Sequence, residues 1–233
     1  MTMLRQMSRR GRVDALLQDG LQDGKMNGLA NILQPAVKTS DLSPTPLDSA
    51  EIAAVFKKAS NLPQDAYDAL LVYLQATGHQ YRAFNAFPHP PNALILPPRV
   101  ELPLQVHRGD HTFSCQHSHE GNSAIQFRNP HTQQHDTGFI EAIWRIPLEG
   151  AMHTFFVVRP HQQLPDSEEG QAPFVHFPGF MSQIVDAVPS TQLMIIQPVH
   201  FITHLTTFQC PSGTYSIPRE TIIICWALNR GRW

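Results

Sequence analysis

The feature that most constrains the fold of this chain is the nearly continuous apolar run Thr154-Phe155-Phe156-Val157-Val158. β-Branched and aromatic residues in succession favour a strand, and apolar side chains on both faces require cover on both sides. The run therefore predicts a central strand, and Gly150, four residues earlier, predicts a hairpin connection. Similar short runs predict further strands at residues 124–128, 138–144, 193–196, 202–208 and 221–226. Five or six short strands of this kind suit a small, curled antiparallel β-sheet or an SH3-like barrel.

The chain before this region has a helical pattern. Asp48 and Glu51 have the spacing of a capping box ahead of a short helix. Pro63 begins a second, amphipathic helix that ends near Gly78, with apolar residues at Tyr67, Leu70, Leu71 and Leu74. A proline-rich connector follows over residues 87–103. We therefore predict an α+β fold in which N-terminal helices pack on the sheet.

The same features predict the division of the chain. We expect a disordered leader over residues 1–46, a helical segment with its proline-rich connector over 47–103, a β-rich interaction module over 104–228, and a tail over 229–233.

Charge is unevenly distributed along the 233 residues. All four lysines precede residue 60, and from residue 61 onward nine arginines face thirteen acidic residues, a formal charge of 9 − 13 = −4. A surface of that sign does not hold a phosphate backbone through bulk charge. The leader instead carries an arginine cluster that can act as a nucleic-acid-contacting or nuclear-import arm, formed by Arg5, Arg9, Arg10 and Arg12.

Three irregularly spaced cysteines exclude a disulfide framework and favour an intracellular setting, with the nucleus as the compartment that the arginine arm would indicate. No run of about 18 apolar residues occurs, so we expect no membrane span.

No motif for nucleophilic catalysis, phosphate cradling or dinucleotide binding is present, which favours a non-catalytic protein without a cofactor. The acidic residues Asp166, Glu168 and Glu169 are too close together for a two-metal transferase site and predict a solvated loop. One metal site stays open as an alternative. If residues 115–119 are extended, Cys115, His117 and His119 project from one face and can share a zinc ion.

Several short segments resemble a known group of proteins. They are His119-Glu120-Gly121-Asn122-Ser123, Ile125-Gln126-Phe127, Gly138-Phe139-Ile140, the Phe174-x-x-Phe177-Pro178 step and Ile195-Ile196, with Leu62-Pro63 and Leu96-Pro97-Pro98-Arg99 upstream. Over roughly residues 60–228 the chain resembles the C-terminal module of uncharacterised transposase-associated proteins of basidiomycete fungi. More remotely, the strand order ending in Arg159-Pro160 resembles bromo-adjacent-homology and other SH3-like chromatin modules. This resemblance implies a protein that binds chromatin or a protein partner.

A binding surface on such a module is expected at loops and strand ends. The candidates are Trp144 with Arg145, the turn carrying Phe177 and Phe180, and Arg159 with His161 just past the central strand. Three hypotheses follow: an interaction module, a nucleic-acid-associated protein that uses the arginine arm, and a zinc protein.

Overall fold

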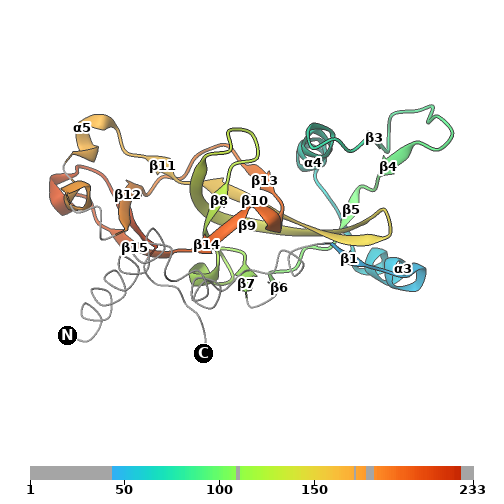
Figure 1. Ribbon diagram of the computed structural model, residues 1–233, viewed down its shortest axis with the longest axis horizontal. Helices are drawn as coiled ribbons and strands as arrows, with labels where there is room; N and C mark the ends of the chain where they lie inside the picture. Colours follow the sequence, from blue (N-terminus) through green and yellow to red (C-terminus); the bar gives the residue numbers. More distant parts are fainter. Residues whose placement is uncertain (1–43, 109–110, 171, 177–180, 227–233) are drawn as a thin grey trace, which may run out of the picture.

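The structure is a computed structural model that describes residues 44–108, 111–170, 172–176 and 181–226 (Figure 1). Within these ranges the fold is mostly β. The N-terminal part holds α3 (Ser49–Lys58) and α4 (Gln64–Ala76) with the short strands β1 (Thr45–Pro46), β2 (Ser60–Asn61), β3 (Tyr81–Ala83), β4 (Leu94–Leu96) and β5 (Arg99–Val100). A small hairpin of β6 (Gln105–Arg108) and β7 (His111–Ser114) leads into the two larger sheets.

The main sheet is antiparallel and curls into half a barrel, as the sequence predicts in general form. Its strand order is β1-β10-β9-β8-β14, and β13 also pairs with β10. Besides β1, its strands are β8 (Ala124–Arg128), β9 (His135–Leu148), β10 (Ala151–Pro160), β13 (Met194–Ile196) and β14 (Phe201–His204).

A long hairpin of β9 and β10 forms the centre of this sheet (Figure 1). Glu149 and Gly150 at its tip both have positive φ, 51° and 77°, as a tight two-residue hairpin turn requires. The prediction of a hairpin at Gly150 is therefore confirmed. Both strands are longer than the predicted segments, because residues such as Arg145 and His153 continue the pairing although they break the apolar pattern.

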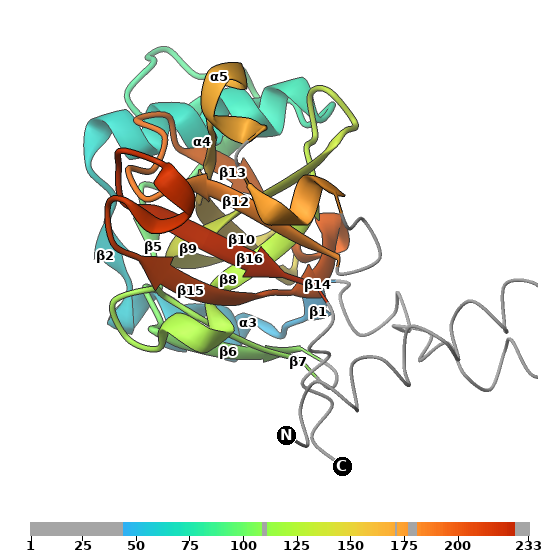
Figure 2. The same cartoon turned by 90° about the vertical axis from the view of Figure 1, so that its left-hand side faces the viewer.

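A second, four-stranded sheet has the order β11-β12-β16-β15 and lies against the main sheet (Figure 2). Its strands are β11 (Gln162–Gln163), β12 (Ser182–Asp186), β15 (Thr206–Cys210) and β16 (Thr221–Cys225). The predicted single strand 202–208 is wrong, because the chain changes sheets at Leu205. That side chain is buried between the sheets, and its backbone N–H donates to the Ala124 carbonyl at 2.9 Å.

The apolar run at 154–158 has the cover that its sequence requires. Phe155 and Val157 belong to one core cluster with residues of α4, whereas Phe156 and Val158 belong to a second cluster with β6, β7 and β8. All of residues 154–158 are buried. The predicted central strand is therefore confirmed.

The two helices differ in how they relate to the core. The capping box of α3 is formed by Asp48 and Glu51 as predicted, yet α3 has no buried residue. α4 buries Tyr67, Leu70, Tyr73 and Leu74, and the Tyr73 ring meets the Phe155 ring edge-on at 6.0 Å. Among the described residues, no helix is both long enough and apolar enough to cross a membrane.

Candidate functional site

A cleft of about 500 Å³ lies beyond the end of β10, next to the predicted site residue His161. The pairing of β10 with β13 ends at Val158 and Met194, and the cleft lies beyond this pair. One wall consists of residues 160–163, which include β11, and the other of residues 190–194. β11 is a terminal strand of the four-stranded sheet, so the cleft runs along a sheet edge.

The walls of the cleft are polar but carry no Asp, Glu, Lys or Arg among the described lining residues. Amide groups come from Gln162, Gln163 and Gln192, and hydroxyl groups from Ser190 and Thr191. Each amide has an acceptor oxygen and a donor NH2 group, and each hydroxyl can both donate and accept a hydrogen bond. The cleft therefore suits an uncharged polar ligand rather than an ion.

Arg159 holds the two walls in place from outside the cleft. Its Nε donates to Glu141 Oε1 at 2.8 Å, and its Nη1 donates to the Ser190 carbonyl at 3.3 Å. The Ser190 N–H in turn donates to the Pro160 carbonyl at 3.1 Å. Arg159 therefore holds the wall of the cleft at Ser190, and its positive charge is balanced by Glu141.

Among the described lining residues, His161 is the one titratable side chain, and it is 8% exposed. Its Nδ1 lies 3.0 Å from Thr137 Oγ1, and Phe139 meets the imidazole edge-on at 4.7 Å. Nε2 is buried and has no hydrogen-bond partner among the described residues. Burial lowers the pKa of His161 to about 4, so the imidazole is neutral near pH ~7.

His161 should make the stability of the protein depend on pH. Because its folded pKa is depressed to about 4, protonation of the unfolded chain below pH ~6.5 favours unfolding. Its contribution is fully present above pH ~6.5 and is lost as the pH falls toward the folded pKa. As the pH falls from ~6.5 to about 4, the free energy of unfolding of the wild type should fall by about 3 kcal/mol more than that of His161→Gln. Urea denaturation at several pH values in this range measures the difference.

A matched control is His135→Gln, which changes an exposed histidine of the same β9 strand. This variant should keep the pH dependence of the wild type. Equal slopes for wild type and His161→Gln would show that the buried imidazole does not carry the effect.

The structure separates the predicted binding residues. His161 lines the cleft, and Arg159 lies outside it, bonded to the Ser190 carbonyl of the cleft wall; a binding role for these two residues stays a prediction. Trp144 is 6% exposed in the hydrophobic core, so an open groove at this residue is not found. Arg145 projects from the opposite face of β9, 3.4 Å from Glu101. Phe177 and Phe180, like the arm residues Arg5, Arg9, Arg10 and Arg12, lie outside the described residues.

Residues 115–119 form a turn and not an extended strand, so the geometry expected for a zinc site at Cys115, His117 and His119 is not present. The N–H groups of Ser118 and His119 both donate to the Cys115 carbonyl, at 2.9 and 3.0 Å. Cys115 is buried, and burial raises the pKa of its thiol. Across the described part of the chain, no three His, Cys, Asp or Glu side chains are grouped to hold a metal ion.

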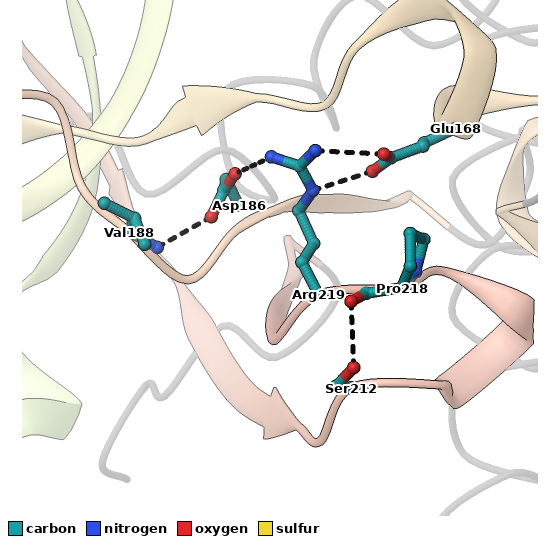
Figure 3. A network of polar contacts seen from close by, with 6 residues as sticks. All are labelled: Glu168, Asp186, Val188, Ser212, Pro218 and Arg219. Carbon is teal, nitrogen blue, oxygen red and sulfur yellow. Dashed lines mark hydrogen bonds and ion pairs between the residues drawn. The ribbon is translucent and has the colours of Figure 1, made fainter.

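A second polar feature was missed by sequence reasoning and involves the predicted solvated loop. Glu168 lies on α5 (Asp166–Glu169), and Arg219 forms a bidentate ion pair with it, at 2.8 and 2.9 Å (Figure 3). Arg219 also donates to the buried Asp186 at 2.9 Å, whose other oxygen accepts from the Val188 N–H. These bonds raise the pKa of Arg219, with Asp186 as the first cause and Glu168 as the second. Because Arg219 bonds to Glu168 of α5 and to Asp186 of β12, this cluster fastens α5 to the four-stranded sheet.

Comparison with known proteins adds no relative to this description. No protein-family model, curated protein or solved structure matches the chain.

Proposed function

We propose that this protein is a non-catalytic interaction protein, and that its cleft beside β11 receives an extended, uncharged segment of a protein partner. The observation that carries the proposal is the uncharged polar cleft along a terminal strand. Strand edges offer backbone N–H and C=O groups in register, which is how many domains add a peptide as an extra strand.

The chemistry of the walls supports a peptide over a charged small molecule. A peptide backbone alternates donors and acceptors, and the amides of Gln162 and Gln192 can meet both kinds. The amide of Gln163 already bonds to the side chain of Gln183, which orients it at the cleft wall. Leu193 and Met194 add apolar surface for one or two side chains of the ligand.

The resemblance of the chain to SH3-like and bromo-adjacent-homology modules extends the same proposal. A curled β-rich domain with helices at one end is compatible with an SH3-like or bromo-adjacent-homology-like module of a mobile-element-associated protein, acting on chromatin in the nucleus. Methyl-lysine readers of that kind use an aromatic cage, whereas the described lining of this cleft includes no Phe, Tyr or Trp. We therefore propose recognition of an unmodified, extended backbone.

Filling the cleft should abolish this binding. Thr191→Trp places a bulky ring at an exposed position of the cleft wall, where it should block a peptide without disturbing the core. Peptides selected by the wild type from a phage-displayed library of random linear sequences should bind the variant at least about tenfold more weakly, a loss of roughly 1.4 kcal/mol. Fluorescence polarisation with the selected peptides measures the change.

Thr132→Trp is the control, because Thr132 is exposed in the turn between β8 and β9. It should bind the selected peptides like the wild type. A histone-tail peptide array tests the chromatin part separately. Failure of the library to yield any peptide, or equal binding by Thr191→Trp, would reject the cleft as a peptide site.

A further inference from the structure

We propose that a second site, formed by Arg108 of β6 and Arg145 of β9, binds the phosphate group of a phosphorylated serine or threonine in a protein partner. The two arginines reach the same place from different strands. Thr154 lies directly opposite Arg145 in the pairing of β9 and β10, and residues paired in this way project from the same face. Arg108 Nη2 donates to Thr154 Oγ1 at 2.7 Å, which brings its guanidinium over this pair.

The surroundings hold Arg108 in a fixed orientation. Its Nη1 donates to Thr45 Oγ1 at 2.9 Å, so two threonine hydroxyls accept hydrogen bonds from the same guanidinium. Each hydroxyl that accepts from Arg108 keeps its own proton for another acceptor. Thr45 is exposed, and its hydroxyl can donate to an oxygen of a bound anion. Figure 1 shows β1 and β6, which carry Thr45 and Arg108, along the same side of the β9–β10 hairpin.

Positive charge is only partly balanced at this place. Among the described residues, Arg145 has one carboxylate partner, Glu101, at 3.4 Å, and the Arg145 side chain remains 37% exposed. The pKa of Arg108 is lowered, first by burial and second by the positive charge of Arg145. Two guanidinium groups facing one carboxylate leave a local charge of 2 − 1 = +1 among these three side chains. An anion bound between the arginines would remove their mutual repulsion.

The charge of the remaining chain selects the kind of anion. A phosphorylated serine or threonine carries a charge of about −1.5 to −2 and three acceptor oxygens, which two guanidinium groups can meet. A nucleic acid brings a long row of charges, and the chain from residue 61 onward has a formal charge of −4, from nine arginines and thirteen acids. A single phosphate on an otherwise neutral peptide therefore fits better than a polyanion.

This inference goes beyond the proposed peptide cleft and does not depend on it. Thr154 and Pro160 are six positions apart on β10, which places the two sites roughly 20 Å apart along the strand. The cleft variant Thr191→Trp should therefore leave phosphate binding unchanged. Loss of one activity with retention of the other would distinguish failure of either proposal.

The test is an NMR titration with inorganic phosphate at constant ionic strength, observed through the arginine side-chain N–H signals. The signals of Arg108 and Arg145 should shift together with a saturable response. Arg145→Gln should weaken binding about fivefold, whereas Glu101→Gln should strengthen it about threefold because it removes the competing carboxylate. Arg145 is the first choice because it is partly exposed, whereas Arg108 also fastens β6 to two other strands.

Arg128→Gln is the matched control. Arg128 is exposed and pairs with His135 at the start of β9, roughly 30 Å along the strand from Arg145. It should bind phosphate like the wild type. A neutral peptide with one phosphoserine should bind more tightly than its unphosphorylated form and than a short DNA duplex. No response of Arg108 and Arg145, weaker binding by Glu101→Gln, or preference for the duplex would each overturn the proposal.

Discussion

Replacing Gly138 with alanine is expected to lower the free energy of unfolding by about 3 kcal/mol. Gly138 pairs with Pro160 at the end of the β9–β10 ladder. A Cβ atom at this position would lie 2.5 Å from the Arg159 carbonyl oxygen and 2.8 Å from Val158 Cγ1. The first contact is with backbone, which cannot move aside as a side-chain tip can. Urea denaturation of the wild type and Gly138→Ala measures the difference.

Gly170→Ala is the matched control, since nothing lies within 4 Å of a Cβ added there and its φ of −63° suits alanine. Its unfolding free energy should stay within about 0.5 kcal/mol of the wild type. Equal stability of the two variants would mean that the β9–β10 pair separates at Gly138 without cost.

The same substitution connects stability to the cleft. Thr137 and Phe139, the neighbours of Gly138, contact His161 through a hydrogen bond and an edge-on ring contact. Separating β9 from β10 would therefore displace His161 together with Arg159 and Pro160. We expect Gly138→Ala to weaken peptide binding in the cleft as well, in line with its effect on folding.

The central part of the fold could be predicted because its signals are local. Residues 154–158 need cover on both sides wherever they lie, and Gly150 allows a turn with positive φ. The change of sheet at Leu205 could not be predicted in this way. Residues on both sides of Leu205 favour strands, and the position of the break depends on burial between two sheets that the local pattern does not describe.

The candidate sites, too, include residues with a local sequence signal and contacts between residues far apart in the sequence. Arg159 and His161 are candidates from the sequence because they lie at and just past the end of the central strand, and strand ends commonly carry function. The ion pair between Arg219 and Glu168 joins residues 51 positions apart. Arg108 and Thr154 are 46 positions apart. No periodicity connects such pairs, so only the folded arrangement brings them together.

Trp144 gives the sharpest test of core against groove, because sequence reasoning placed it at a binding surface. Trp144 is 6% exposed and lies in the cluster that joins α4 to the β9–β10 hairpin. Trp144→Ala should therefore lower the free energy of unfolding by about 3–5 kcal/mol, measured by urea denaturation.

Phe208→Ala is the control for aromatic truncation, because Phe208 is 67% exposed on the terminal strand β15. This change should cost less than about 1 kcal/mol, since little surface is buried there to lose. At a low temperature, where Trp144→Ala is folded, the variant should still bind cleft peptides, because Trp144 is not among the residues that line the cleft. A stable Trp144→Ala protein that has lost peptide binding would instead place the tryptophan at the binding surface and contradict its position in the core.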